Sequence, residues 1–416
     1  DVVKIVKVAN NCNVPIVPRG SGTGLEGHSS NITDDNICID LSHMNTILQI
    51  NENDSDLVCQ AGATWDDINH TLQDSGTKLF FPLDPAPGAT IGGMMATSCS
   101  GTNAVRYGTA RAEWFLSATV VLPSGEVIKT RRRAHKSSAG FDLTQLFIGS
   151  EGTLGIITEV AIRLAPLLPS TVAIAHFPNV ENACSAVDAL LKSQYGVHIQ
   201  CVELADSIFM EALNHSLTSS GTATSYPASD SLFIKLQGDK DTLRDVLRVT
   251  KQILERHGSM KIRFANGNEE ARTMWDHRKG ALLAILGYIK DSEVWSTDVC
   301  VPVSNLPKLV RQVQEDAATM NVICPIVGHV GDGNFHAALI YRSKSEFKKV
   351  QELSKRIVER ALTLDGTCTG EHGVGVGKRH YLAKELGDET VEVMRTIKRT
   401  IDPKDLMNPG KLYPPV

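Results

Sequence analysis

The chain has 416 residues, which is more than one ordinary hydrophobic core holds, so two domains are expected. Hydrophobic residues make up 42% and charged residues 21% of it, as is typical of a globular protein. The formal net charge of −5 argues against nucleic acid as the main partner, because a surface that follows phosphates needs an excess of basic residues. The short basic run at 131–133 is best explained as a solvated hairpin edge.

Nine cysteines are scattered along the chain without a CxxC pair. Their odd number and irregular spacing argue against a disulfide framework or a cysteine-based zinc site, and favour reduced thiols in a cytosolic or matrix compartment. No apolar run is long enough to span a bilayer, so no transmembrane segment is expected. The first residues already have the pattern of an amphipathic helix, and we expect the chain to begin inside a domain, with any targeting segment outside it.

The part from 1 to 167 mixes glycine-rich turns with short β-prone runs. Strands are predicted at 14–17, 37–41, 57–61 and 117–122. A helix is predicted at 66–75, ending before Gly76. This mixture predicts an α+β domain.

Pro166 and Pro169 suggest a boundary, beyond which the pattern changes to longer helices. We predict a sheet with helices laid on it, followed by a terminal helix and a tail rich in proline and glycine. The expected helices are 180–192, 241–257, 306–320 and 345–363, and the expected strands are 232–237, 324–329 and 337–341. The expected domains are therefore 1–167, 168–389 and a C-terminal segment at 390–416.

The first site signal is the segment from Pro18 to Gly27, which contains a GxGxxG pattern. A Rossmann dinucleotide site needs a helix directly after such a loop, whereas here a turn-like run at 28–36 leads into another strand. The NAD interpretation is therefore disfavoured. Successive glycines still let backbone N–H groups converge on a phosphate, although a hairpin without a ligand explains the loop about equally well on its own.

Two more glycine-dense loops follow, at 82–97 and 149–158. With the first loop, and in this order, they resemble the FAD-binding domain of the vanillyl-alcohol-oxidase type flavoproteins. The resemblance implies a two-subdomain FAD-binding domain, with the pyrophosphate at the first loop and the isoalloxazine and adenine at the other two. It implies FAD contacts at Arg19, Gly20, Ser21, Gly22, Thr23, Gly24, Pro82, Asp84, Gly88, Thr90, Gly92, Gly93, Gly101, Tyr107, Gly108, Glu151, Gly152, Gly155 and Ile157.

Some members of that family attach FAD covalently through a histidine in or near the first loop. Here Thr23 and Gly24 occupy the loop, and His28 lies past it. Non-covalent FAD is therefore expected.

A second cluster of chemical groups lies in the later half. His329 and His336 flank a Gly-Asp-Gly-Asn turn, and this spacing suits a strand–turn–strand that brings both imidazoles together. Farther on, Glu371 and His372 stand among glycines. Two histidines and one glutamate are a competent ligand set for Zn²⁺ or Mn²⁺ with open positions.

Such a metal would lower the pKa of the hydroxyl group of a chelated 2-hydroxy acid. A neighbouring imidazole could then take the hydroxyl proton, and the Cα hydrogen would leave as hydride to flavin N5. Either histidine alone is more often an ordinary residue of a strand, so the hypothesis depends on their joint occurrence with the glutamate and an FAD domain.

The segments around 329–336 and 368–375 resemble the C-terminal cap domain of the D-lactate dehydrogenase, glycolate oxidase and D-2-hydroxyglutarate dehydrogenase branch. Within it the likeness is greatest to the mitochondrial FAD-dependent enzymes that act on D-lactate. The resemblance implies an α+β cap with an antiparallel sheet, with His329, His336 and Glu371 as metal ligands and His372 as the base. It also implies a mitochondrial location and an electron acceptor such as cytochrome c or an electron-transfer flavoprotein.

Two more residues follow from the resemblance. Arg278 matches an arginine that grips the substrate carboxylate, although His277 stands where the family has a small residue, and a helix-surface arginine remains the alternative. Asn408 in the tail is expected near the flavin.

The 2-hydroxyglutarate enzymes carry an Asn and a Lys at positions that correspond to Ala338 and about Ser296. Uncharged, smaller residues there favour monoacids such as D-lactate, with D-2-hydroxyglutarate dehydrogenase or glycolate oxidase-type activity as the alternative. An NAD-type oxidoreductase and a non-catalytic ligand-binding relative are hypotheses of other classes. Bound yellow flavin would distinguish the FAD-dependent dehydrogenase from both of these alternatives.

Overall fold

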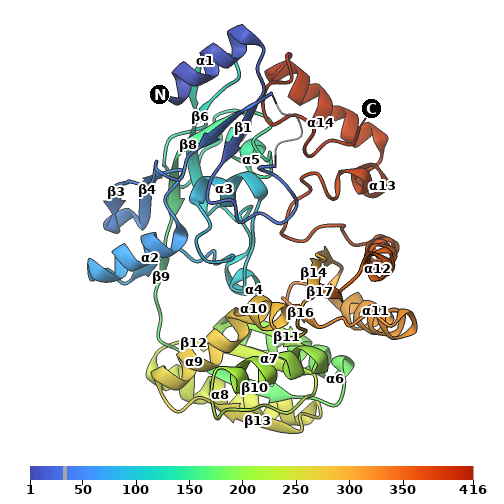
Figure 1. Ribbon diagram of the computed structural model, residues 1–416. Coiled ribbons are helices and arrows are strands. Elements are labelled where there is room, and N and C mark those ends of the chain that lie inside the picture. Colours follow the sequence, from blue (N-terminus) through green and yellow to red (C-terminus); the bar gives the residue numbers. More distant parts are fainter. Residues whose placement is uncertain (31–34, 416) are drawn as a thin grey trace. The chain divides into compact units, whose positions relative to one another are not determined.

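The computed structural model describes residues 1–30 and 35–415, and these form two compact units (Figure 1). The first unit comprises 1–101, 107–167 and 371–416, and the second comprises 102–106 and 168–370. The chain thus passes from the first unit to the second after Leu167, where the prolines suggested a boundary. It returns after Gly370, whereas the ranges 168–389 and 390–416 place the return later, and as domains these ranges remain predictions.

The first unit is built on a five-stranded antiparallel sheet with the order β3-β4-β8-β6-β7. These strands are β3 (Ile47–Asn51), β4 (Asp56–Gln60), β6 (Phe115–Val121), β7 (Val127–Lys129) and β8 (Ile156–Arg163). Two small pairs accompany it: the parallel β1 (Ile16–Arg19) and β2 (Ile37–Asp40), and the antiparallel β5 (Leu79–Phe80) and β9 (Ala165–Pro166).

The helices of the first unit are mostly short. They are α1 (Val2–Cys12), α2 (Trp65–Asp74), α3 (Ile91–Thr97), α5 (Leu143–Phe147), α13 (Leu382–Leu386) and α14 (Asp388–Ile401), whereas α4 (Ala104–Tyr107) begins in the short segment 102–106 that belongs to the second unit. Helix α2 begins at the N-cap Thr64, whose side chain accepts a hydrogen bond from the N–H of Asp67. The predicted helix at 66–75 is thus confirmed.

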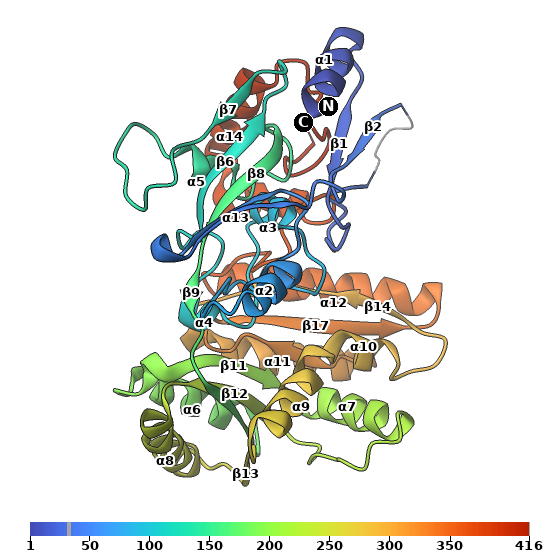
Figure 2. The ribbon, with the colours of Figure 1, turned by 90° about the vertical axis from the view of Figure 1, so that its left-hand side faces the viewer.

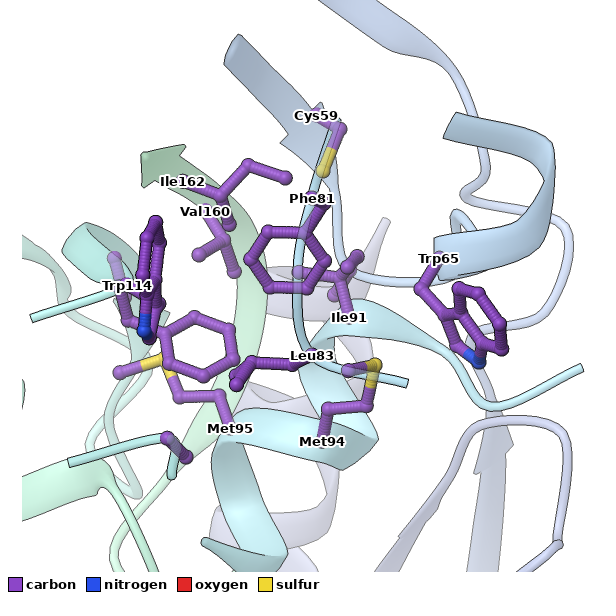
Figure 3. Packing of buried hydrophobic residues seen from close by; sticks show 14 of the residues in the cluster. Cys59, Trp65, Phe81, Leu83, Ile91, Met94, Met95, Trp114, Val160 and Ile162 are labelled. Atoms are coloured by element: carbon purple, nitrogen blue, oxygen red, sulfur yellow. The ribbon is translucent and has the colours of Figure 1, made fainter. Parts of the chain in front are cut away.

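The first unit's main core fixes the position of α3, the helix that begins in the second glycine-rich loop (Figure 3). Met94 and Met95 of α3 pack into the same cluster as Val160 and Ile162 of β8. A Cβ at Gly92 would lie 2.7 Å from the Cβ of Ala61, so only glycine lets this helix approach the end of β4 so closely.

The described residues between β1 and β2, namely 20–30 and 35–36, contain no helix. The remainder of the expected turn-like run, 31–34, lies outside the described residues. The prediction that no Rossmann helix follows the first loop agrees with every described position.

The second unit is an eight-stranded antiparallel sheet with the order β13-β10-β12-β11-β16-β17-β14, in which β15 also pairs with β17. The strands are β10 (Ser170–His176), β11 (Ile199–Ala205), β12 (Ser231–Gln237), β13 (Lys261–Phe264), β14 (Glu293–Ser296), β15 (Val299–Cys300), β16 (Ile326–Gly328) and β17 (Asn334–Tyr341).

Two groups of helices accompany this sheet, and Figure 2 shows α12 running alongside β17. One group contains α6 (Val180–Lys192), α8 (Lys240–Arg256), α11 (Leu306–Met320) and α12 (Lys344–Thr363), which contact one another in the order α8-α6-α11-α12. The other contains α7 (Ser207–Ser219), α9 (Asn268–Lys279) and α10 (Ala281–Leu286). The predicted architecture, which consists of an α+β FAD-binding part and an α+β cap with an antiparallel sheet, is confirmed.

Asp206 holds the end of β11 to its neighbours. It is almost fully buried, and its carboxylate accepts hydrogen bonds from the N–H groups of Phe209 in α7 and Ile326 in β16. Burial raises the pKa of Asp206 to about 7, with a further rise from Asp230, although both backbone hydrogen bonds oppose it.

A pH dependence of stability follows. Because the folded-state pKa of Asp206 lies above its ordinary value of 3.8, the contribution of the protonated carboxyl to stability is complete below about pH 4 and is lost as the pH rises through 7. The loss is at most roughly 4 kcal/mol. We expect Asp206→Asn to remove this component, so that the difference in melting temperature between pH 5 and pH 8 shrinks relative to wild type. An unchanged difference would contradict the assignment.

No helix among the described residues is long and apolar enough to cross a membrane.

Candidate active site

Every predicted FAD contact lies in the first unit. Strand β1 ends at Arg19 and delivers the chain into the first glycine-rich loop, where Gly22 has a φ of 77°, which glycine adopts without strain. The backbone N–H groups of residues 21–25 donate no hydrogen bond within the described part of the chain. A loop with such available donors fits a pyrophosphate group.

The three glycine-rich loops converge in this unit. A Cβ at Gly20 would lie 2.2 Å from Oγ1 of Thr90, so the first and second loops touch. A Cβ at Gly152 of the third loop would lie 2.6 Å from Cγ of Pro18. Glycine is therefore required where the loops meet, and the structure brings together residues that are widely separated in the chain.

Asn408 ties the C-terminal tail to these loops. Its Nδ2 donates hydrogen bonds to the backbone oxygens of Glu151 at 2.7 Å and His28 at 3.0 Å, and its own N–H donates to Ile16 of β1. Asn408 is buried, so these bonds replace those it would make with water. The tail therefore packs against the first and third loops.

Other predicted FAD positions have different surroundings. A Cβ at Gly101 would lie 2.6 Å from Oδ1 of the buried Asp84, and the backbone oxygen of Tyr107 accepts a hydrogen bond from Trp114. Gly155 packs against Val120 of β6 and Phe147 of α5, and Ile157 is paired with Val120 in the sheet. Gly155 and Ile157 thus lie in the sheet core.

The carboxylate of Glu151 has a structural task that the sequence did not reveal. It is buried, with a left-handed φ of 52°, and accepts hydrogen bonds from the N–H groups of Val374 at 2.7 Å and Gly375 at 2.8 Å. These two residues directly follow the Glu371–Gly373 segment. Glu151 therefore fixes the backbone from which that segment extends.

Glu151→Gln should lower the stability of the FAD-bound chain. One of the two backbone donors would face the amide NH₂ group, and the loss of a charged hydrogen bond costs about 1.5–3 kcal/mol. Chemical denaturation followed by flavin release would measure it. Glu126→Gln, at an exposed position in the β6–β7 turn, should change little. Equal effects of the two substitutions would count against this role.

The second unit carries the two histidines of the predicted metal site. Strand β16 ends at Gly328, His329 follows it, and His336 lies on β17, opposite Val327. A Cβ at Gly328 would lie 2.5 Å from the Cα of Phe335, so only glycine permits this tight strand pair. The imidazole centroids are 5.4 Å apart, and the predicted strand–turn–strand is what brings them together.

Glu371 completes a set of three candidate ligands. It directly follows Gly370, which packs closely against the side chains of Asn334 and Asp298. One ligand atom each from His329, His336 and Glu371 lie within 4.8 Å of one another. These are the three residues predicted to bind the metal.

The hydrogen bonds of the histidines orient them for this task. Nδ1 of His329 lies 2.8 and 3.0 Å from the carboxylate oxygens of Glu203, and Nδ1 of His336 lies 3.3 Å from the backbone oxygen of Thr297. With Nδ1–H donating in both rings, Nε2 becomes the nitrogen that can ligate a cation. The donor set of two imidazoles and one carboxylate fits Zn²⁺ or Mn²⁺.

His372, the predicted base, belongs to a second group of potential metal-ligating residues. Ligand-type atoms of Asp298, His336 and His372 also lie within 4.8 Å of one another. Asp298 is buried and accepts hydrogen bonds from Asn334 at 2.8 Å and Thr369 at 2.9 Å. Asp298 therefore fixes Asn334 and Thr369, each of which stands two residues from a candidate ligand in the chain.

Arg278, the predicted substrate clamp, is buried on α9 rather than exposed on a helix surface. Its Nη2 donates a 2.5 Å hydrogen bond to Glu203. Sequence reasoning missed Glu203 altogether. Its only signal was an acidic residue in the middle of the apolar run from Ile199 to Ala205.

The two positions expected to select the substrate face each other. Ser296 of β14 is the cross-strand partner of Ala338 of β17, and Ala338 lies on the same face of the strand as His336, two residues earlier. Ala338 is part of a hydrophobic cluster with Trp275 and Ile340. The surface beside the histidine is therefore apolar.

Two family models match this chain. The model described as "FAD binding domain" matches residues 1–131, and the model described as "FAD linked oxidases, C-terminal domain" matches residues 169–412. The chain is 42% identical over 418 residues to "D-lactate dehydrogenase [cytochrome], mitochondrial" of Arabidopsis thaliana, across 100% of this chain and 72% of that protein. It is 41% identical to "D-lactate dehydrogenase [cytochrome] 1, mitochondrial" of Saccharomyces cerevisiae, across 99% of this chain and 70% of that one.

A solved structure with the same fold is that of 4-ethylphenol oxidase from Gulosibacter chungangensis in complex with isoeugenol. It matches with a TM-score of 0.79 at 16% identity, covering 99% of this chain and 87% of that one. This likeness concerns the fold alone. The full-length matches at 41–42% identity and the model for the C-terminal domain show that the chain belongs to the FAD-linked oxidases.

Proposed function

We propose that this chain oxidises D-lactate and related D-2-hydroxy acids to 2-oxo acids, with FAD and a divalent cation. The observation that carries the proposal is the set His329, His336 and Glu371, with ligand atoms within 4.8 Å of one another, in an FAD-linked oxidase. The relatives named D-lactate dehydrogenase support the substrate class.

The first unit would hold the cofactor non-covalently. The open backbone donors of 21–25 suit the pyrophosphate, and the glycines at 20 and 152 let the loops close around it. Bound FAD supplies a hydride acceptor at N5. The predicted FAD contacts, including Asn408, are part of this proposal.

His329 and His336, together with Glu371, would hold Zn²⁺ or Mn²⁺, which supplies Lewis acidity for the substrate hydroxyl. His372 would take the hydroxyl proton at an imidazole nitrogen, and Arg278 would hold the carboxylate of the substrate. The buried surroundings of Arg278 strengthen such an interaction, because water screens it little.

The apolar surface beside His336 favours a substrate with one carboxylate. Neither Ser296 nor Ala338 carries a charge that would balance a second carboxylate, and Ala338 belongs to the hydrophobic cluster. The names of the relatives support a cytochrome-type acceptor and a mitochondrial location.

The direct test is the visible spectrum of the purified chain under anaerobic conditions. We expect a yellow protein whose oxidised flavin absorbance is lost on addition of D-lactate and persists with L-lactate. Faster loss with D-2-hydroxyglutarate or glycolate would transfer the assignment to those acids. A colourless preparation that responds to NADH would overturn it.

A further inference from the structure

Glu203 is an unusual residue for its place in the fold. It lies in the middle of β11, its side chain is fully buried, and its neighbours on the same face of the strand are Cys201 and Ala205 of the hydrophobic cluster. Removing a carboxylate from water costs several kcal/mol unless good partners replace the water. A strand selected for packing alone would carry an apolar residue here.

Two buried partners surround this carboxylate. Strands β11 and β16 pair with Leu204 opposite Gly328, so the antiparallel register brings Glu203 beside His329. The carboxylate oxygens lie 2.8 and 3.0 Å from Nδ1 of His329, and Oε2 also accepts the 2.5 Å hydrogen bond from Arg278. Both partner side chains are only 7% exposed.

We infer that Glu203 is a positioning residue that couples the metal ligand His329 to the substrate-binding Arg278. This inference rests on the proposed function. The carboxylate accepts Nδ1–H of His329 and so presents Nε2 to the cation, and it also holds one edge of the guanidinium.

The hydrogen bonding of Arg278 supports a role beyond charge balance. Its Nε is buried without a hydrogen-bond partner among the described residues, and Nη2 is the atom that Glu203 holds. Within the described part of the chain, Glu203 is thus the hydrogen-bond acceptor that orients the guanidinium. Loss of Glu203 would disturb the cation site and the carboxylate site together, although Glu203 itself would touch neither ligand.

The test is Glu203→Gln in the FAD-bound chain from which metal has been removed. Glutamine keeps the size but removes the charge, and its NH₂ group would set a donor against Nδ1–H of His329 or against Nη2 of Arg278. Titration with Mn²⁺, followed by calorimetry, should show an affinity about 10–100-fold below wild type. Steady-state kinetics with saturating Mn²⁺ should show a KM for D-lactate raised about tenfold or more, with a smaller change in kcat.

Asp206→Asn is the matched control, because Asp206 is also a buried carboxylate at the end of β11 and contacts neither His329 nor Arg278. We expect wild-type Mn²⁺ affinity in this variant. A folded Glu203→Gln protein with wild-type Mn²⁺ affinity and KM would overturn the inference, as would equal losses in both variants.

If Glu203→Gln does not fold, Glu203→Asp provides the same test, because its shorter side chain cannot reach both partners. Arg278→Lys is a third test variant. Arg278 is not a metal ligand, and yet its replacement should change the Mn²⁺ affinity through Glu203. Wild-type affinity in these variants would contradict the coupling. The Mn²⁺ titration uses no D-lactate, so it tests the coupling independently of the reaction. If D-lactate fails to reduce the flavin of the wild-type protein, the proposed function is overturned by that separate result.

Discussion

His372→Ala is expected to leave a folded, yellow protein in which D-lactate reduces the flavin about 100- to 10,000-fold more slowly than in wild type. The imidazole is the group that would accept the hydroxyl proton, and a neutral histidine has a pKa suited to that transfer near neutral pH. Ligand-type atoms of His372 gather with those of Asp298 and His336, which places a base where the cation ligands are. Anaerobic stopped-flow absorbance of the flavin measures the rate.

His380→Ala is the control for this substitution, since His380 lies a few residues farther along the same segment and is exposed. Its variant should bleach at the wild-type rate. If His372→Ala also bleaches at that rate with its FAD content intact, another group must be the base.

His336→Ala should release the divalent cation, because it removes one of its three protein ligands. Since the cation is the Lewis acid of the proposed reaction, flavin reduction should slow by about 100-fold or more. His336 lies on a strand whose partner β16 is held by backbone hydrogen bonds, so the sheet should survive the substitution. Elemental analysis of the purified variant measures the cation, and stopped-flow absorbance measures the rate.

Chelation gives the matching result without a substitution. Wild-type protein treated with a chelator should lose activity and regain it with Mn²⁺ or Zn²⁺, whereas His336→Ala should not recover at the same cation concentration. His43→Ala, an exposed histidine of the first unit, should retain both cation and rate. Full activity of a cation-free sample would contradict the role of the three ligands.

Local patterns predicted the regular helices well. The predicted ranges 180–192 and 306–320 coincide with α6 and α11, because an apolar face repeats through each and, in α6, the side chain of Asn179 caps the first turn. The helix α7 and the strands β10 and β11 were not predicted. Strand β11 is buried along its whole length and therefore lacks the alternation that marks a strand with one exposed face.

The residues of the candidate site likewise fall into those that local motifs could predict and those that they could not. His329, His336 and Glu371 could be found because each stands in a short glycine-rich motif, and the motif itself constrains the backbone. Glu203 could not, because its partners lie 75 and 126 residues away in the chain and only the strand register brings them together. The return of the chain to the first unit after Gly370 was also beyond local patterns, since Glu151 binds backbone groups more than 200 residues away.

The rate at which D-lactate carrying deuterium at C2 reduces the flavin of the cation-loaded chain tests the proposed chemistry most directly. If the C2 hydrogen leaves as hydride, the anaerobic stopped-flow bleaching is several-fold slower with deuterated than with unlabelled D-lactate, and it nearly stops when the cation has been removed. Equal bleaching rates with deuterated and unlabelled D-lactate, or bleaching at the same rate without the cation, would contradict it.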